Sequence, residues 1–513
     1  MLEVLAAVWL AVERIANGSR ELPSFLRRHG PLLAALAVAS LANSLRHGAG
    51  WAVEPLVARV SLVAIVLSAY GCFRRTGLRL DALRGSVALS AAIVVSIGLL
   101  QMAGVNPLPW LSGGDQRSAT FGNVNMAAQF LGMAVVVALS APPAVGLARL
   151  VRELSIAGGL AYVALAGTRS VALALGAALL VLAVARRLPI ALFARTAVLA
   201  GLLVALLVAA PSSRPSASDL EASKQTSARM RLAVWVDTLA LVRDHPFGVG
   251  AGGFEQAFVP YALGGRSRPG EGLVFRSPHN ELLRLVAEEG FLGAGLALTL
   301  LFLLARELHR HSGFGSWRSD TGALLASVSA FLVVESIFQF PFALAVPSLL
   351  ACVLLGLALA LLEPAAGALE QTPAPRVGVA ARAGDVVCLL VAAAIVLGLA
   401  RMAIADYLFT NRRDDRPSLE RACALDPRRL DACVEAAWRH SQDSDHGAAQ
   451  ARLRAVLAVS PDYLPAIKLM AEDLFAQGRP AVACGYARAY DALLRGQGSW
   501  RVPEVCGTTP TPR

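Results

Sequence analysis

Residues 170–210 read SVALALGAALLVLAVARRLPIALFARTAVLAGLLVALLVAA, two apolar runs separated by Arg186 and Arg187. Each run is close to the length of about 17–25 residues that a helix needs to cross a bilayer. The pattern recurs along the chain, in which 56% of the 513 residues are hydrophobic, 16% are charged and the mean hydropathy is +0.57. Repeated membrane spans explain these values much better than a soluble core does.

The sequence therefore predicts an all-α, polytopic membrane protein with about 11–12 transmembrane helices. Eleven apolar runs are predicted spans: 31–46, 52–71, 86–104, 123–141, 151–167, 170–185, 190–210, 287–305, 321–339, 343–362 and 385–405. A twelfth candidate, residues 2–16, is interrupted by Glu3, Glu13 and Arg14, so it is either a span or a surface helix. Glu3 also stands where a cleaved signal peptide would carry basic residues, which argues against such a peptide.

The positions of the arginines predict how the spans are oriented. Sixteen arginines lie in alternate loops, and only Arg46, Arg117 and Arg169 lie in the short loops between them. Because loops rich in Lys and Arg stay on the cytoplasmic side, the long loop 211–286 and the chain after about residue 406 are expected on the outer face. We expect a bacterial inner membrane, with this loop and the C-terminal region in the periplasm. The net charge of +11 thus reflects membrane topology and does not indicate a nucleic-acid partner.

The C-terminal region has the composition of a soluble helical domain and contains a repeat. Ala424-Leu425-Asp426-Pro427 recurs loosely as Ala458-Val459-Ser460-Pro461, and the step of 34 residues is the tetratricopeptide period. We expect three parts: an N-terminal segment, 1–30, a membrane domain, 31–405, and a tetratricopeptide-like domain, 406–513. Such a domain would dock a protein partner or stabilise the membrane part. A plain helical hairpin bundle is the alternative.

Four cysteines, Cys423, Cys433, Cys484 and Cys506, lie in this C-terminal region. In an oxidising compartment they would form two disulfides, with three possible connectivities. Cys423 and Cys433 flank the turn at Pro427, so we favour the pairs Cys423–Cys433 and Cys484–Cys506. A zinc site is the alternative, but no C-x-x-C pair supports it. The sequence thus predicts neither a metal site nor a cofactor.

The outer loop 211–286 contains an amphipathic segment, residues 228–242, whose apolar residues recur at helical spacing. We expect a helix that lies on the bilayer surface and ends at Asp244-His245-Pro246. Arg231 and Trp235 are four residues apart and share one face of this helix. A tryptophan that anchors an arginine toward lipid phosphate is the alternative to a role in substrate binding.

Further along, Ser277-Pro-His279-Asn280 places polar groups where the loop re-enters an apolar helix. Ionisable groups at a membrane boundary are costly and often functional. His279 titrates near neutral pH, so it can accept or orient the proton of a substrate hydroxyl, and a helix-capping role is the alternative. Glu288 and Glu289 are expected to cap the following helix or to pair with Arg284.

Together these segments resemble the signature of the O-antigen ligase and polysaccharide polymerase superfamily. The resemblance rests on Arg231-x-x-x-Trp235, residues 244–254, Ser277-Pro-His279-Asn280 and residues 289–293, all in or beside one outer loop. Residues 120–125, Thr-Phe-Gly-Asn-Val-Asn, are similar to a further loop of the family, although Ala119 and Val124 replace its usual glycine and proline. Thr168-Arg169-Ser170 is similar to the family's arginine at the outer junction of two spans.

The resemblance implies a GT-C-type glycosyltransferase that moves a glycan from undecaprenyl pyrophosphate to an acceptor hydroxyl with inversion and, in the ligase branch, without a metal. It implies that Arg169 and Arg231 bind the pyrophosphate, which suits the permanently charged, bidentate guanidinium. With His279 they are the predicted catalytic residues. The predicted substrate-binding residues are Asn123, Asn125, Asn280 and Trp235.

Three functions stay open at this point. The first is lipopolysaccharide biosynthesis, with lipid A core as the acceptor of a ligase or a second lipid-linked glycan as the acceptor of a polymerase. The second is an O-linked protein oligosaccharyltransferase, to which the outer repeats would present a protein. The third is a non-enzymatic glycan transporter or scaffold. Charged residues that gather outside the membrane, instead of along a midplane path, argue against transport.

Overall fold

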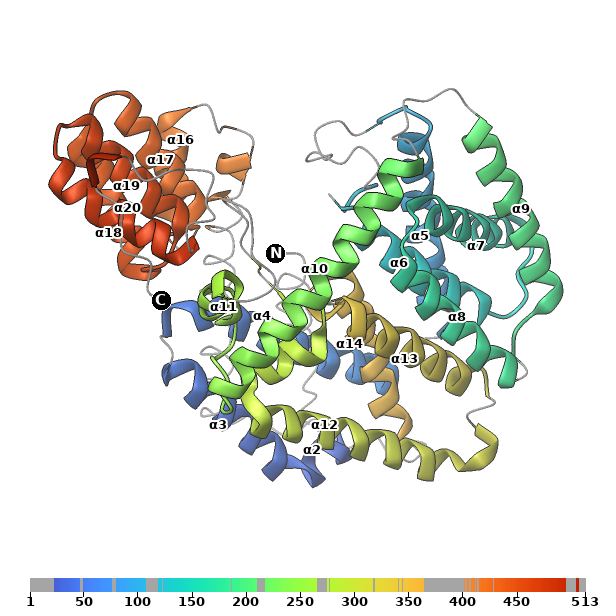
Figure 1. Ribbon diagram of the computed structural model, residues 1–513. Coiled ribbons are helices and arrows are strands. Elements are labelled where there is room, and N and C mark those ends of the chain that lie inside the picture. Colours follow the sequence, from blue (N-terminus) through green and yellow to red (C-terminus); the bar gives the residue numbers. More distant parts are fainter. Residues whose placement is uncertain are drawn as a thin grey trace.

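The chain is all-α within the residues that the structure, a computed structural model, describes (Figure 1). Those residues are 23–46, 49–75, 80–107, 119–121, 123–185, 187–209, 217–264, 275, 277–316, 319–339, 341–343, 345–363, 401, 404–405, 407–410, 412, 415–427, 429–494 and 504–506. The candidate span at 2–16 and most of the predicted span at 385–405 lie outside them.

Ten of the eleven predicted spans are helices in the structure. They are α3 (Gly30–Arg46), α4 (Ala49–Arg75), α5 (Leu80–Met102), α6 (Val124–Leu139), α7 (Gly146–Ala166), α8 (Arg169–Val184), α9 (Ile190–Ala209), α12 (Glu281–Ser316), α13 (Asp320–Phe338) and α14 (Ala345–Leu361). Within the described residues, α5, α13 and the stretch Glu281–Arg310 of α12 are long and apolar enough to cross a membrane, and five shorter apolar helices accompany them. The protein is thus a polytopic membrane protein.

The core of the membrane part forms around α6, which packs against α5, α7, α8 and α13. All residues of α6 from Ala127 to Leu139 are buried. A Cβ on Gly132 would lie 2.8 Å from the side chain of Val171 and 2.9 Å from that of Phe331. Small residues at such contacts let membrane helices approach closely. A second cluster joins α4 and α14 with α2 (Ser24–Arg28) and α12.

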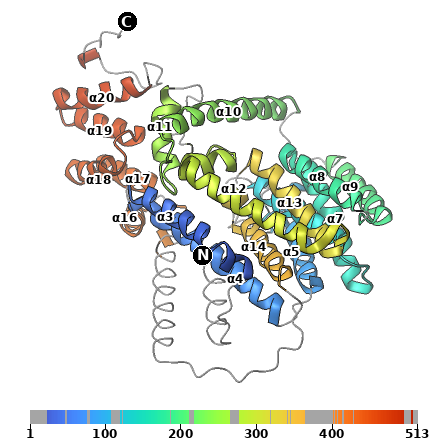
Figure 2. The same ribbon diagram turned by 90° about the horizontal axis from the view of Figure 1, so that it is seen from below.

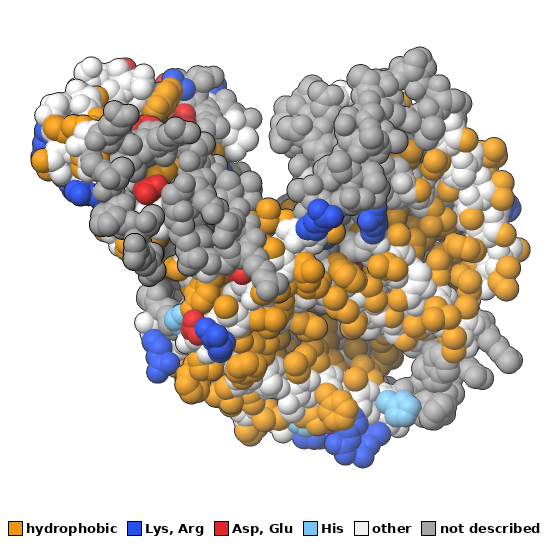
Figure 3. Space-filling model, viewed as in Figure 1, with side chains coloured by type: hydrophobic (Ala, Val, Ile, Leu, Met, Phe, Trp, Pro, Cys, Tyr) orange, Lys and Arg blue, Asp and Glu red, His pale blue; other side chains and the backbone are white. Residues whose placement is uncertain are grey.

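Hydrophobic side chains cover the outside of these helices. Large exposed examples on α8, α9, α12 and α13 are Leu173, Leu180, Leu202, Phe302 and Val333. Figure 3 shows hydrophobic side chains spread over much of the visible surface of the helix bundle. Because a soluble protein rarely exposes so wide an apolar surface, lipid is its natural cover.

The long loop predicted at 211–286 is largely helical. It contains α10 (Ala217–Asp244), which ends where the sequence predicts, and α11 (Phe254–Gly264). The predicted helix is confirmed, and part of its apolar face is buried against protein. Val234 and Leu241 of α10 are buried in a cluster formed with α11 and the start of α12. Helices α11 and α12 therefore cover this part of α10. Leu232 and Leu239 of α10 are exposed, so the predicted place of this helix on the bilayer surface stays a prediction.

Within the described residues from 415 to 494, the helices are α16 (Arg416–Leu425), α17 (Leu430–Gln442), α18 (His446–Val459), α19 (Leu464–Ala476) and α20 (Pro480–Leu494). Each packs against the next one along the chain. Helices α17 and α19 begin 34 residues apart, at Leu430 and Leu464, and α18 and α20 begin 34 residues apart, at His446 and Pro480. The helices thus repeat with the predicted period, while their assignment to the tetratricopeptide class stays a prediction.

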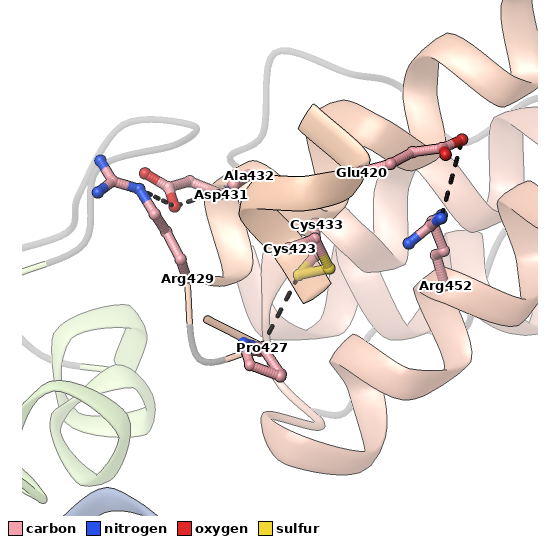
Figure 4. The surroundings of a disulfide bond; sticks show 8 residues. All are labelled: Glu420, Cys423, Pro427, Arg429, Asp431, Ala432, Cys433 and Arg452. Atoms are coloured by element: carbon pink, nitrogen blue, oxygen red, sulfur yellow. Dashed lines mark hydrogen bonds and ion pairs between the residues drawn. A yellow bond between two sulfur atoms is a disulfide. The ribbon is translucent and has the colours of Figure 1, made fainter. Parts of the chain in front are cut away.

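Two disulfides link the four cysteines of this region. Cys423 and Cys433 join α16 to α17, with their Cα atoms 4.9 Å apart. Figure 4 shows this bond beside Pro427, whose carbonyl oxygen lies 4.0 Å from the sulfur of Cys433. Cys484 of α20 is bonded to Cys506 in the short helix η3 (Glu504–Cys506). The favoured pairing is therefore confirmed, and these sulfurs are not zinc ligands.

The C-terminal helices contact the outer loop through α11 and α20, which lie side by side in Figure 2. Val259 of α11 packs against a cluster formed by Leu464, Ile467 and Tyr490. The repeat region thus touches the helix that precedes the segment carrying His279.

Candidate functional site

Two predicted site residues of α10 meet at the last turn of α13. Arg231 donates a hydrogen bond through Nη1 to the carbonyl oxygen of Phe338, at 3.3 Å. The ring of Trp235, one turn further along α10, has its centroid 6.4 Å from that of the Phe338 ring. Because both side chains reach the same residue, the prediction that Arg231 and Trp235 share a face is confirmed.

Trp235 also holds the segment that carries His279. Its Nε1 donates to the carbonyl oxygen of Pro278 at 2.9 Å. The backbone N–H of His279 donates to Oγ of Ser277 at 3.1 Å, and its φ of +52° lies in the left-handed region that residues with a Cβ seldom adopt. These contacts fix His279 in an uncommon backbone conformation beside α10, a feature often found where a side chain is held for function.

The electrostatic surroundings keep the imidazole of His279 neutral. Burial lowers its pKa below the ordinary value of 6.5, and the nearby positive charge of Arg231 lowers this pKa further. A hydrogen bond with the side chain of Gln339, the buried residue that follows α13, partly opposes that shift. A neutral imidazole is the form that can accept a proton.

Arg231 has most of its donor capacity left for a ligand. Burial lowers the pKa of its guanidinium, and the carboxyl group of Glu335 opposes this lowering. An arginine nevertheless stays protonated in proteins. Within the described part of the chain, Arg231 forms no ion pair and donates only to the carbonyl oxygen of Phe338. The remaining N–H groups can therefore bind an anion.

Glu335 and Gln129 belong to this cluster but are not among the residues predicted from the sequence. Glu335 is 0% exposed, and its Oε2 accepts a hydrogen bond from Nε2 of Gln129 at 2.7 Å. Ser170, the residue after Arg169, lies beside the same carboxyl group. The sequence signal that would have revealed Glu335 is an ionisable residue inside an apolar run.

Arg169 is the exposed first residue of α8. The side chain of Thr168, the residue before it, does not cap this helix. A helix N-terminus carries partial positive charge, and Arg169 adds a full one, so this end of α8 attracts anions. Since its neighbour Ser170 lies beside Glu335, Arg169 is at the same end of the bundle as Arg231.

Two of the predicted asparagines cap helices. Oδ1 of Asn123 accepts from the backbone N–H of Asn125 at 2.8 Å at the start of α6. Oδ1 of Asn280 accepts from the backbone N–H of Leu283 at 2.9 Å at the start of α12. Asn280 therefore fills the capping role that was the alternative for His279. A role for Asn123, Asn125 and Asn280 in substrate binding stays a prediction.

The glycine turn after α10 docks directly on the backbone of α12. The backbone N–H of Gly250 donates to the carbonyl oxygen of Glu288 at 2.9 Å, and Gly290 has a φ of +70°. A Cβ on Gly248 would lie 2.4 Å from the carbonyl oxygen of Glu288, and one on Gly290 would lie 2.2 Å from the carbonyl carbon of Phe247. Glycines at these positions let the two backbones meet and fix the start of α12.

Glu288 and Glu289 have a partner, Arg59, in addition to the predicted Arg284. Both lie inside α12, which has already begun at Glu281, so they do not cap a following helix. Arg59 of α4 pairs with Oε2 of Glu288 at 3.4 Å and also with Glu289. Arg284 forms its ion pair with Glu281. The predicted cap is therefore wrong, whereas Arg284 does interact electrostatically with both glutamates, as predicted. The sequence did not reveal Arg59, because it reaches α12 from another helix.

The fold and the site define a class of protein: a polytopic membrane protein with arginines and a neutral histidine gathered at one end of its helix bundle. Residues 154–298 match the family model described as O-antigen ligase, which supports a place for this chain in the O-antigen ligase superfamily. This superfamily transfers glycans in surface polysaccharide biosynthesis. The matched range includes Arg169, Arg231, Trp235, His279 and Asn280. A comparison with curated proteins found no significant match.

Proposed function

We propose that the protein is a GT-C-type glycosyltransferase that moves a glycan from undecaprenyl pyrophosphate to an acceptor hydroxyl at the outer face of a bacterial inner membrane. The convergence of Arg231, Trp235 and His279 near the last turn of α13 carries the proposal. A group that binds pyrophosphate and a group that accepts a proton thus lie together, both within the range that matches the family.

The donor binds through its pyrophosphate. Arg231 offers several N–H groups, and a guanidinium binds phosphate oxygens in a bidentate manner. Arg169 and the N-terminus of α8 add positive charge at the same end of the bundle. As the bond between the anomeric carbon and the pyrophosphate oxygen breaks, negative charge grows on the leaving oxygen, and these groups stabilise it.

His279 acts as the general base for the acceptor. The acceptor oxygen attacks the anomeric carbon on the side opposite the pyrophosphate, so a new carbon–oxygen bond forms as the old one breaks and the configuration inverts. The hydroxyl proton moves to the imidazole, which the lowered pKa of His279 keeps neutral before the reaction. A positioned general base is typically worth about 10²–10⁴ in rate.

As a ligase the protein would use lipid A core as its acceptor, and as a polymerase it would use a second lipid-linked glycan. A protein acceptor for an O-linked oligosaccharyltransferase is a second candidate, because the C-terminal helices pack against α11 and so stand beside the outer loop. Helical repeats commonly present surfaces for binding other chains.

Surface glycans of a strain that lacks the protein test the proposal. Loss of all long chains from lipid A core would identify a ligase, a ladder collapsed to one unit would identify a polymerase, and unglycosylated secreted protein would identify transfer to protein. The proposal would be contradicted if the deletion changed neither the chains on lipid A core, nor their length, nor the glycans on secreted protein.

Complementation of that strain tests the site. We expect wild-type protein to restore the glycans and Arg231→Lys to fail, because an ammonium cannot reproduce the guanidinium fork. Arg243→Lys is the matched control, since Arg243 lies on the same helix with its side chain 79% exposed. Full restoration by Arg231→Lys would instead support an interfacial anchor.

A further inference from the structure

Arg59 is a charged residue within α4, one of the predicted membrane spans, and the proposed reaction does not use it. Its guanidinium links three helices. Nη1 donates to Oγ of Ser40 on α3 at 2.8 Å and to Glu289 on α12, and Nη2 donates to Oε2 of Glu288 at 3.4 Å. The side chains of Glu288 and Glu289 are 6% and 3% exposed. Charged groups are costly to place in a membrane domain, so they usually serve a function.

The regular path of α12 is interrupted directly after these two carboxylates. Gly290 has a φ of +70°, which lies outside the right-handed helical region. The backbone N–H of Phe291 donates at 2.9 Å to the carbonyl oxygen of Pro246, a partner outside the helix. Residues 281–289, the entry segment, are therefore a short helical piece that joins the apolar part of α12 at a break.

His279 lies just before the entry segment, at the end remote from the break. At 1.5 Å per helical residue, the break is about 15 Å from His279, so a tilt of about 4° there moves the imidazole by about 1 Å. A misplacement of about 1 Å can cost about 10²-fold in rate. Trp235 holds the His279 end through the carbonyl oxygen of Pro278. Arg284 and Glu281 pair within the entry segment and so cannot fix its tilt.

We propose that Arg59 is a positioning residue for His279. By pairing with Glu288 and Glu289 beside the break, it holds the entry segment at a fixed tilt against α4. The imidazole then meets the acceptor hydroxyl where that hydroxyl can attack the donor. This inference rests on the proposed function, because it adds a distant hold on the base of that reaction.

Substitutions of Arg59 in full-length protein purified in detergent test the inference. We expect Arg59→Met to lower kcat by about 10²-fold. The KM for the undecaprenyl-pyrophosphate-linked glycan should stay unchanged, because Arg231, which is proposed to bind this donor, lies on α10. Arg59→Lys keeps the charge but cannot reproduce the guanidinium fork, so its kcat should lie between those of Arg59→Met and the wild-type protein. An unchanged kcat in Arg59→Met, or a donor KM that rises as much as kcat falls, would overturn the inference.

A triple variant separates positioning from a loss of stability. Arg59→Met leaves buried carboxylates without their cation, so the midpoint of thermal unfolding should fall. Adding Glu288→Gln and Glu289→Gln removes these charges, so the midpoint should rise again, which also covers the case in which Arg59→Met does not fold. The kcat of the triple variant should stay low, because no ion pair links the entry segment to α4. Recovery of kcat together with stability would overturn the inference.

Arg84→Met is the matched control for a buried arginine in another span. Arg84 of α5 pairs with Asp81 and donates to the carbonyl oxygen of Asp320, at the end of α13 opposite to Phe338. Its loss should lower the midpoint of unfolding and leave kcat near the wild-type value. An equal fall of kcat in Arg84→Met would overturn the inference. Wild-type protein that transfers no glycan would instead overturn the proposed function, which distinguishes the two failures.

Discussion

Arg231 lowers the pKa of His279, and it also carries the charge that is proposed to attract pyrophosphate. Both effects follow from one position, because Arg231 on α10 and His279 at the entrance to α12 approach the same turn of α13. Burial is the larger cause of the lowered pKa, and the charge of Arg231 is the second. A substitution can remove the charge of Arg231, so its effect on the pKa of His279 can be measured.

The acid limb of the pH profile should move when Arg231 is replaced. A general base works only when neutral, so kcat/KM of the wild-type protein should fall as the pH drops through the lowered pKa of His279, below 6.5. Arg231→Gln removes the positive charge, so the pKa of His279 should rise toward its ordinary value and the limb should move to higher pH. The pH dependence of kcat/KM, measured for the wild-type protein and for Arg231→Gln, gives the position of the acid limb in each.

Arg243→Gln is the control for this shift, because Arg243 lies on the same helix, is exposed and pairs with Asp244. Its acid limb should coincide with that of the wild-type protein. An unmoved limb in Arg231→Gln would mean that Arg231 does not act on the base.

Helix α12 depends on the glycine turn that docks on it. The carbonyl oxygen of Glu288 accepts from the backbone N–H of Gly250, and the left-handed φ of Gly290 lets the chain continue into the apolar part of α12. The segment with His279 and the cap at Asn280 lie directly before this helix. The contact between the backbones of Gly250 and Glu288 thus helps to position His279, although neither residue touches it.

Gly290→Ala should therefore destabilise the protein and reduce transfer. A Cβ at this position meets the backbone of Phe247 at 2.2 Å, and a residue with a Cβ at such a φ is strained by about 1–3 kcal/mol. Gly295→Ala in the same helix is the control, since a Cβ there meets nothing within 4 Å and should be neutral or stabilising by up to about 1 kcal/mol. Thermal unfolding in detergent compares the two variants, and equal stability would contradict this role of Gly290.

The helices could be predicted from the sequence because each long apolar run identifies a span without any knowledge of its contacts. The span predicted at 170–185 is found as Arg169–Val184, and the helix with Arg231 and Trp235 ends at the predicted Asp244. The partners of buried charges could not be predicted in this way. Gln129 and Glu335 are 206 residues apart in sequence, and Arg59 and Glu289 are 230 apart, so only the packing of different helices brings them together.

At the scale of the whole molecule, the predicted disulfides agree with a C-terminal region that folds outside the cytoplasm. The proposed orientation of the membrane part places the outer loop on that same side. Val259 of α11 packs against the cluster that contains Tyr490 of α20, which requires α11 and α20 to be on one side of the membrane.

A thiol reagent that cannot cross membranes tests this orientation. In a variant with Cys72, Cys352 and Cys388 replaced by serine, intact cells with a permeabilised outer membrane should show labelling only after reduction, because the four remaining cysteines are paired. Peptide mapping should place the label in α16, α17, α20 and η3. Labelling that requires a permeabilised inner membrane would put the repeats in the cytoplasm and contradict the outward-facing site.

Glycan transfer by the purified full-length protein tests the central claim most directly. The assay supplies an undecaprenyl-pyrophosphate-linked glycan and an acceptor lipid, and it measures the transferred glycan and the released undecaprenyl pyrophosphate together. We expect transfer by the wild-type protein, a loss of about 10²–10⁴ in kcat for His279→Ala with the donor still bound, and wild-type activity for His309→Ala, whose histidine is exposed near the far end of α12. A wild-type rate for His279→Ala, or transfer from a nucleotide sugar in place of the lipid donor, would contradict the account.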